Sequence, residues 1–488
     1  MNRRSFLTAG AGLAALALNP EALRAAAANQ VAGDWRLGFA DLEADLPRGP
    51  MTLVQGRAPA GLSGALYRNG SGKFRRPGAS ATHWFDGDGL MRAFRIHDGQ
   101  ATLEARFADT PKRRRDTAAG AVITPGFGTA AGPGAKIGSA DDSNAANISV
   151  LPMGDELWAL WEAGSPLVMD PDTLATRDFK TLRPDLRGMP FLAHPRREPG
   201  GRVWNLGVAG SKAVVWRLSP DGALEAADLI DLPRASYVHD FTATDRHLIL
   251  VLQPWIQDRM TLPYVDSLTW RPQMGTQVLV LDKADLSRRR VFELPSFFCF
   301  HMGDAWAEAD GTLRFDACIS ADPGFALQGA RDVLAGKVTH GGGGARLAMI
   351  SLNPNGSADL ARTVLVAEFP RTDGRFAGRA RRYTVHATGL TPGRPLFEGV
   401  AVHDWTRDVE RRFHFGPRQM VEEAVFVARP GSSAEFDGWL LVPTLNLDAG
   451  ASELHVFDAG AVQDGPICGW RGAAGLPVGL HGAFVARS

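Results

Sequence analysis

Short apolar runs joined by tight turns restrict this chain to a structure built mainly from β-strands. The runs 90–96 and 102–107 flank Asp98-Gly99, a dipeptide typical of the two-residue turn of a β-hairpin. Similar turns lie between apolar runs at Asp221-Gly222, Asp310-Gly311 and Asn355-Gly356, and the runs 148–151, 156–162 and 167–170 are expected to form a meander. The pattern predicts a large all-β architecture that closes on itself, either a propeller or a barrel.

Few segments depart from this strand pattern. Helical periodicity is clearest from Phe325 to Val338, which we expect to form a helix. The segment 111–147 is rich in Gly, Ala, Ser and Asp and is predicted to be a loop. Its basic cluster, residues 112–115, is expected to be a solvated surface turn rather than a binding patch. Residues 341–344 are four glycines, expected to be a flexible break, and no linker divides residues 29–488, which we expect to form one domain.

Charge and cysteine content argue against two classes of protein. Lys+Arg and Asp+Glu both number 53, so no net charge draws the chain to nucleic acid, and no nucleic-acid partner is expected. The three cysteines, Cys299, Cys318 and Cys468, are too few and too scattered for a disulfide framework. They also lack the paired spacing of a zinc site.

The first 28 residues have the pattern of an export signal. Arg3 and Arg4 precede an apolar run from Ala9 to Leu18 and then an alanine-rich stretch, which is typical of a twin-arginine signal peptide. The apolar run is too short to span a bilayer, which needs about 20 residues. The segment 1–28 is therefore predicted to direct the protein to the periplasm. This route carries folded proteins, often with a cofactor already bound.

Four of the twelve histidines have similar surroundings. His194, His239, His301 and His481 each have apolar neighbours and lie next to the end of an expected strand. Each one alone is more typical of a hydrogen-bonded core residue than of a metal ligand. They are far apart in the chain, so they can meet only where strands from distant segments converge. If they do meet, imidazole nitrogens would suit a first-row transition metal.

Two other motifs have a structural alternative that we favour. The sequence Asp86-Gly87-Asp88-Gly89 is similar to part of a calcium loop, but it lacks the later ligands and is expected to be a turn. His239-Asp240 and His403-Asp404 are similar to the His-Asp pair of metal phosphohydrolases. In those enzymes the pair lies on a helix. Here both pairs lie among residues typical of strands.

Several separate motifs make the chain similar to the carotenoid cleavage oxygenases, a family of non-haem iron enzymes that also includes stilbene-cleaving enzymes and the retinoid isomerase of the eye. The resemblance covers nearly the whole mature chain and rests on the segments 66–70, 83–89, 169–174 and 270–276, and on the surroundings of the four histidines. It implies a seven-bladed β-propeller with Fe(II) on its axis, held by His194, His239, His301 and His481. Loops and helices would cap the iron site and form a substrate tunnel.

The resemblance also implies three glutamates that hold the ligand histidines. The matching positions are Glu162, Glu368 and Glu423, although the adjacent Glu422 leaves the last assignment open to an error of one residue. A ligating imidazole usually donates its second N–H to such an acceptor. The chain departs from the family at Asp304, where Asn is usual, and at Leu480, where Phe is usual.

The activity implied is O₂-dependent cleavage of a conjugated C=C bond in a carotenoid or apocarotenoid, giving two carbonyl products. Phenolic-stilbene enzymes of the family tend to carry Lys just before the first of these glutamates, whereas this chain has Trp161, a candidate residue of the substrate tunnel. An indole offers apolar surface and no charge, which favours an apolar polyene. Stilbene cleavage, isomerisation and carotenoid binding without catalysis are the alternatives, and peripheral membrane contact is expected because polyenes partition into lipid.

Overall fold

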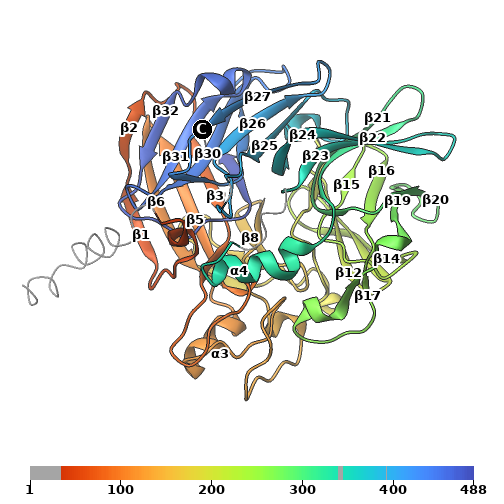
Figure 1. Ribbon diagram of the computed structural model, residues 1–488, viewed down its shortest axis with the longest axis horizontal. Helices are drawn as coiled ribbons and strands as arrows, with labels where there is room; N and C mark the ends of the chain where they lie inside the picture. The colour runs from red at the N-terminus through yellow and green to blue at the C-terminus, as the bar shows by residue number, and fades with distance from the viewer. Residues whose placement is uncertain (1–33, 339–343, 392, 488) are drawn as a thin grey trace, which may run out of the picture.

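The computed structural model describes residues 34–338, 344–391 and 393–487. Its strands form seven blades arranged around an axis, which makes the fold a seven-bladed β-propeller (Figure 1). The innermost strands of several neighbouring blades contact one another. The contacting pairs are β29 (Val425–Ala428) with β33 (Gly482–Ala486), β33 with β7 (Ser149–Met153), β15 (Thr242–Ala243) with β21 (Phe298–Ala307), and β21 with β24 (Ala358–Arg371). The expected signal segment, 1–28, lies outside the described residues, and so do 341–343 of the expected glycine break.

The first blade joins the two ends of the chain. Its strands, in order, are β1 (Leu46–Pro50), β6 (Gln100–Phe107), β5 (Asp88–His97), β3 (Gly64–Arg68) and β33 (Gly482–Ala486), and β4 (Ser71–Lys73) pairs with β5. The turn between β5 and β6 is the hairpin predicted at Asp98-Gly99, and both residues have positive φ, 47° and 73°. These dihedral angles suit the type I′ turn, which matches the twist of the strands.

The next three blades are formed from consecutive segments of chain. The second contains β7 (Ser149–Met153), β8 (Glu156–Leu160), β9 (Leu167–Met169) and β10 (Thr176–Phe179), as the meander predicted. The third contains β11 (Arg196–Arg197), β12 (Val203–Ala209), β13 (Lys212–Leu218) and β14 (Leu224–Asp231). The fourth contains β15 (Thr242–Ala243), β16 (His247–Leu252), β19 (Thr276–Asp282) and β20 (Arg289–Leu294), with the ribbon β17 (Trp255–Gln257) and β18 (Leu268–Trp270) inserted between β16 and β19.

One long strand, β24 (Ala358–Arg371), belongs to two blades. Its first part pairs with β23, and its last part, from Ala367, pairs with β25. The fifth blade contains β21 (Phe298–Ala307), β22 (Leu313–Ser320), β23 (Arg346–Leu352) and the first part of β24. The sixth contains the last part of β24 with β25 (Tyr383–Thr388), β26 (Gly399–Asp404) and β27 (Val409–His414).

The seventh blade again combines both ends of the chain. It contains β28 (Gln419–Val421), β29 (Val425–Ala428), β30 (Gly438–Asn446), β31 (Ala451–Asp458), β32 (Cys468–Arg471) and β2 (Thr52–Gly56). In Figure 1 the red-orange strand β2 lies beside the blue strand β32. The middle strands of the blades are buried on both faces, as in the apolar runs 248–252 and 278–281, because side chains of neighbouring blades pack between the sheets.

A group of short helices packs together over one face of the ring. The expected helix near Phe325 is present as a π-turn (Phe325–Gly329) followed by α4 (Ala330–Leu334), and α4 crosses the front of the ring in Figure 1. It packs against the single-turn helices η1 (Trp35–Phe39) and η2 (Trp84–Asp86). The other short helices of the described residues are 140–142, 184–186, 264–267, 272–274, 374–376 and 459–464, the last with a kink at Ala461. Among the described residues, no helix is long and apolar enough to cross a membrane.

The prediction of a loop throughout 111–147 was wrong at its start. Residues Pro111–Ala119 form α3, capped by the Thr110 side chain and ended by Gly120 in the left-handed conformation. The basic cluster is not a solvated turn either, because Lys112 is buried and its ammonium lies 3.0 Å from Asp88 and 3.2 Å from Asp116. The ion pairs replace the solvation that a charge loses on burial, and amino-acid composition alone did not reveal these partners.

Candidate metal centre

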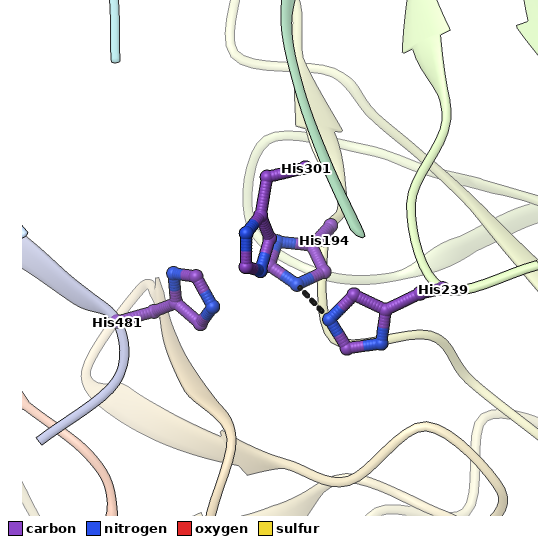
Figure 2. A group of neighbouring side chains, drawn as sticks. All are labelled: His194, His239, His301 and His481. Atoms are coloured by element: carbon purple, nitrogen blue, oxygen red, sulfur yellow. Dashed lines mark hydrogen bonds between the residues drawn. The ribbon is translucent and has the colours of Figure 1, made fainter. Parts of the chain in front are cut away.

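Four histidines from four blades converge on the axis. His194 precedes β11, His239 precedes β15, His301 lies within β21 and His481 immediately precedes β33. One ring nitrogen from each lies within 4.8 Å of the others, and Figure 2 shows the four rings turned toward a common point. Three of the histidines are buried and His194 is half-buried. The structure therefore brings together the four residues that the sequence singled out.

The backbone is irregular at two strands of the site, β21, which carries His301, and β24, which carries Glu368. The pairing of β21 with β22 shifts register on both sides of Met302, next to His301. Such irregularities bend a strand and change the direction of a side chain. In β24 the register shifts between Glu368 and Arg371, and Phe369 has a φ of 58°, which a non-glycine residue rarely adopts. The Phe369 ring lies 5.2 Å from that of His301 and 5.3 Å from that of His481.

Three glutamates hold three of the histidines through Nδ1. Nδ1 of His239 lies 2.6 Å from Glu162, and Nδ1 of His301 lies 2.6 Å from Glu368. Glu423 lies 2.9 Å from Nδ1 of His481. A carboxylate can only accept, so each Nδ1 carries the hydrogen, and the lone pair of each Nε2 is directed into the cluster.

Glu422 and Glu423 have different partners, which resolves the one-residue ambiguity. Glu423 contacts His481 and also accepts a hydrogen bond from the backbone N–H of Gly482 at 2.9 Å. Glu422 instead pairs with Arg68 at 3.0 Å and with Arg92 at 2.8 Å. All of these charged groups are buried, and Arg68 also pairs with Glu423 at 3.0 Å. The two arginines thus compensate the charge of two adjacent carboxylates.

Burial keeps two of the imidazoles neutral. It lowers the pKa of His194 well below the usual value, and the neighbouring imidazoles lower it further. Burial also lowers the pKa of His481 to about 3, despite the opposing charge of Glu423. At His301 burial acts in the same direction, but the charge and hydrogen bond of Glu368 outweigh it and the pKa is raised. Neutral imidazoles with inward lone pairs are the form that binds metal.

The arrangement fits a divalent transition metal. Nε2 of His301 is buried and has no hydrogen-bond partner among the described residues. Nε2 of His194 lies 3.1 Å from Nε2 of His239 (Figure 2). Because Nδ1 of His239 carries its hydrogen, its Nε2 offers a lone pair toward the His194 ring. A buried unpaired acceptor is costly, and a cation among the four nitrogens would satisfy it. Four neutral nitrogen donors suit Fe(II) and its neighbours in the first transition row.

An apolar cavity of about 360 Å³ reaches the cluster from one side. Its wall includes His239, His301 and His481. Aromatic residues form much of the remainder, among them Phe85, Phe127, Trp161, Tyr237, Phe298 and Phe300. Trp161, the tunnel candidate from the sequence, therefore lies on this wall. Phe325 and Val333, from the π-turn and α4, contribute to the same wall, so these helices cover the cavity as expected.

A second cavity, of about 980 Å³, also reaches the cluster. Its wall includes His194, His301 and His481 together with charged residues such as Arg196, Asp240, Asp304, Arg371 and Lys283. The cluster therefore borders an aromatic cavity and a second cavity whose wall also carries charged side chains. A molecule that reaches the four nitrogens through the first cavity therefore meets mainly aromatic side chains, whereas one that uses the second also meets charged side chains.

Sequence reasoning did not identify the polar residues that hold the ligand segments. Arg68 and Arg92 lie on strands of the first blade, far in sequence from the glutamates they contact. The Tyr237 hydroxyl donates to Glu162 at 3.0 Å, and burial raises the pKa of this tyrosine well above its usual value. Tyr237 lies two residues before His239, so proximity to a candidate ligand was a signal that sequence could have supplied.

The two alternative motifs have structural roles. Asp86 accepts the backbone N–H groups of Phe127 at 2.6 Å and Gly128 at 2.9 Å, and Asp88 pairs with Lys112. Their carboxylates hold a turn, as the sequence predicted. His403 and Asp404 lie on strand β26, and Asp404 pairs with Arg382 at 2.5 Å. This histidine is not part of the cluster of four.

Comparison with known proteins agrees with the class that the fold and site define, a propeller with a four-histidine metal centre. Residues 39–486 match the model of the retinal pigment epithelial membrane protein family. The chain belongs to this family, which is that of the carotenoid cleavage oxygenases.

Two curated relatives are similar to nearly the whole chain. The apocarotenoid-15,15′-oxygenase of Synechocystis is 28% identical over 88% of this chain and 92% of its own length. Lignostilbene-α,β-dioxygenase isozyme III of Sphingomonas paucimobilis is also 28% identical, over 89% and 93%. Among solved structures, the cobalt-substituted apocarotenoid oxygenase of Synechocystis superposes with a TM-score of 0.83 at 25% identity, covering 93% of this chain and 98% of that one.

Proposed function

We propose that this protein is a non-haem Fe(II) dioxygenase that cleaves a conjugated C=C bond of a carotenoid or apocarotenoid with O₂. The observation that carries the proposal is the contact between the four-histidine cluster and the aromatic cavity, whose wall includes three of those histidines. A long apolar substrate gains free energy by burial in such a cavity, and its position there selects the bond that is cleaved.

The four histidines would hold the iron, each through Nε2. Iron in this site supplies the activation of O₂. Cleavage of one C=C bond by one O₂ gives two C=O groups, so the electrons balance without a further reductant and no proton is taken up or released. Glu162, Glu368 and Glu423 keep hydrogen on Nδ1 of their histidines, which leaves Nε2 free for the metal. The raised pKa of Tyr237 keeps its hydroxyl protonated and donating to Glu162.

The aromatic wall favours a polyene over a phenolic substrate. Trp161 lies on this wall at the position before Glu162, where the resemblance to the family associates Lys with phenolic stilbenes. An indole ring packs against a polyene and presents one N–H donor, but it cannot form an ion pair with a phenolate. The apocarotenoid oxygenase is therefore the relative whose substrate fits this cavity better.

Cleavage of a hydroxystilbene is the second candidate. It is favoured by the lignostilbene dioxygenase, which has the same identity to this chain as the apocarotenoid oxygenase. Purified iron-loaded protein should be incubated with an apocarotenal and separately with a hydroxystilbene, and the aldehydes identified by mass spectrometry. We expect products from the apocarotenal. Products from the stilbene alone would overturn the preference.

A protein that only binds carotenoid would behave differently in two measurements. It would take up no O₂ with substrate, and its iron content would have no effect on the substrate. An isomerase would change the substrate without incorporating oxygen. We expect O₂ uptake equal to substrate consumed, and oxygen from ¹⁸O₂ in both aldehydes.

We further propose that the protein contacts membranes near the aromatic cavity and acts in the periplasm. Phe325, which lies on the cavity wall, and Leu327 are each 37% exposed on the same π-turn. Met260 is 68% exposed and Leu262 43%, and the segment that follows them bonds to Gly126 and Phe127 beside the cavity. Replacing Phe325 and Leu327 with Ser should reduce sedimentation with phosphatidylcholine vesicles. Fractionation of producing cells tests the periplasmic location predicted from residues 1–28.

A further inference from the structure

One guanidinium group connects three of the four histidine segments. Arg196 lies two residues after His194, on β11. Its Nε donates to the carbonyl of Phe241 at 2.5 Å, two residues after His239. The other two nitrogens donate to the carbonyls of Gly303, at 2.8 Å, and Met302, at 3.1 Å, which directly follow His301.

Asp240 completes this connection. Its Oδ1 accepts hydrogen bonds from Arg196 at 2.7 Å and from the backbone N–H of Phe241 at 2.7 Å. Its Oδ2 accepts from the backbone N–H of Met302 at 2.8 Å. The carboxylate thus joins the segment after His239 to the segment after His301. Thr242 adds one more bond between the same segments, from its hydroxyl to Gly303 at 3.1 Å.

Arg196 and Asp240 are suited to fixing the distances between the histidine segments that they join. The side chain of Asp240 is 2% exposed and that of Arg196 is 20% exposed, so water competes little for their hydrogen bonds. Bonds between charged partners are shorter and stronger than neutral ones, and the planar guanidinium donates in fixed directions. A lysine at position 196 would keep the charge but could not donate to both of the other segments in these directions.

The fourth histidine is held by a separate group of charges. Arg68 donates to the carbonyl of Leu480 at 2.9 Å, and Glu422 accepts from the backbone N–H of Gly479 at 2.9 Å. Gly479 is needed there, because a Cβ at this position would collide with the guanidinium of Arg92. The segments of His194, His239 and His301 form one unit, and the segment of His481 forms another.

We propose that Arg196 and Asp240 are positioning residues of the metal centre, which set the spacing of His194, His239 and His301 before a metal is bound. This inference rests on the proposed metal site and extends it beyond the histidines and their glutamates. Neither side chain needs to contact the metal for this role. Metal sites bind strongly when their ligands are held within about 0.5 Å of the required geometry.

The chain contains a closely matched pair whose hydrogen bonds go to none of the histidine segments. Arg375 donates to both oxygens of Asp373, at 2.9 Å and 2.5 Å, and to the carbonyls of Ser432, at 2.5 Å, and Ala434, at 2.9 Å. Asp373 also accepts from the backbone N–H of Phe436 at 3.0 Å. Its carboxylate is 2% exposed, like that of Asp240, and the Arg375 side chain is 32% exposed. This pair joins distant backbone segments with the same chemistry, so it measures the purely structural effect.

The test compares R196K and D240N with R375K and D373N. Cobalt(II) is the probe, because its visible absorption reports coordination geometry and its affinity can be measured by competition with a chelator. Melting temperatures of the metal-free proteins measure stability. We expect both pairs of variants to lower the melting temperature, whereas only R196K and D240N change the cobalt spectrum and weaken binding, by about tenfold or more, as for other groups that orient metal ligands.

Unchanged cobalt spectra and affinities in R196K and D240N would overturn the inference, and so would equal changes in R375K and D373N. If R196K does not fold, T242V removes a single hydrogen bond of the same unit and should shift the spectrum in the same direction, by less; no shift in T242V or D240N would count against the inference. Failure of the unaltered protein to bind cobalt would instead refute the proposed metal site.

Discussion

Oε2 of Glu368 and Nδ1 of His301 lie 2.6 Å apart, although the two residues are separated by 67 positions and belong to the last part of β24 and to β21. The carboxylate determines which ring nitrogen carries hydrogen, and so directs the lone pair of Nε2 toward the cluster. The shape of β24, with its register shift and the left-handed Phe369, places the carboxylate there. A backbone irregularity in the sixth blade therefore sets the tautomer of His301 in the neighbouring fifth blade.

Removing this acceptor should weaken metal binding. E368A leaves Nδ1–H of His301 without its partner, and we expect metal affinity to fall by about 10- to 100-fold. E368Q can still accept through its amide oxygen and should lose less. Chelator competition with cobalt(II) measures both variants. Equal affinity for E368A and the unaltered protein would contradict the assignment.

Loss of a ligand histidine should abolish iron retention. H239A or H301A removes one of four nitrogen donors, together with the N–H that its glutamate accepts. We expect less than about a tenth of the iron of the unaltered protein after gel filtration with a weak chelator, and no cleavage activity. The reason is that loss of one ligand makes the free energy of metal binding less favourable by well over about 1.4 kcal/mol, which is a factor of ten in affinity. H97A is the control, since His97 is 81% exposed and outside the cluster. Full iron content in H239A would show that this ligand assignment is wrong.

Trp161 should influence the choice of substrate. W161K replaces apolar surface on the cavity wall with a cation that can pair with a phenolate. We expect kcat/KM for an apocarotenal to fall by at least about tenfold, which corresponds to 1.4 kcal/mol of lost transition-state stabilisation. Cleavage of a hydroxystilbene should stay equal or increase. W161F keeps the apolar surface and should retain most of the apocarotenal activity; a large loss there would point to the indole N–H instead.

The buried carboxyl of Asp304 should make stability depend on pH. Burial raises its pKa above the ordinary 3.8, although Arg381 and Arg196 oppose this shift. The folded state therefore binds the proton more tightly than the unfolded state, so this contribution to stability is present below the unfolded pKa and is lost as pH rises through the folded pKa. D304N carries no charge at any pH. Its melting temperature should exceed that of the unaltered protein at about pH 8, and the difference should shrink toward about pH 4.

Metal removal should lower the melting temperature. A ligand that binds only the folded state stabilises it by about 2.7 kcal/mol at 100 times its dissociation constant. Scanning calorimetry of metal-free protein with increasing cobalt(II) should show a progressive rise in melting temperature. In the H301A variant the same titration should give little or no rise. A rise of equal size there would place the stabilising metal elsewhere.

Much of the fold followed from the sequence, because local patterns specify hairpins. The turns at Asp98, Asp221, Asp310 and Asn355 all connect paired strands, and the helix near Phe325 is present. The number of blades came from the family resemblance, since alternation in sequence does not reveal how many sheets surround an axis. The segment that begins with α3 was mispredicted because Lys112 is buried by partners that composition does not show.

The site was predictable in its ligands and less so in its supports. The four histidines could be named from their surroundings, but their convergence depends on contacts between blades distant in sequence. Glu422 and Glu423 were indistinguishable in sequence, and only their partners separate their roles: Glu423 contacts His481, whereas Glu422 pairs with Arg92. Apart from Asp240, the partners of Arg196 are carbonyl groups, which every residue possesses, so no pattern of side chains could indicate them.

The position of β33 has a consequence for the order in which the protein can be completed during synthesis. This strand begins one residue after His481 and pairs with β3, near the start of the described chain. A nascent chain that has reached residue 470 contains three ligand histidines and nearly all the strands of the other six blades. Its first blade still lacks its innermost strand. The complete set of four nitrogens would therefore arise only when the ring closes, so metal uptake would report that translation has passed the last blade.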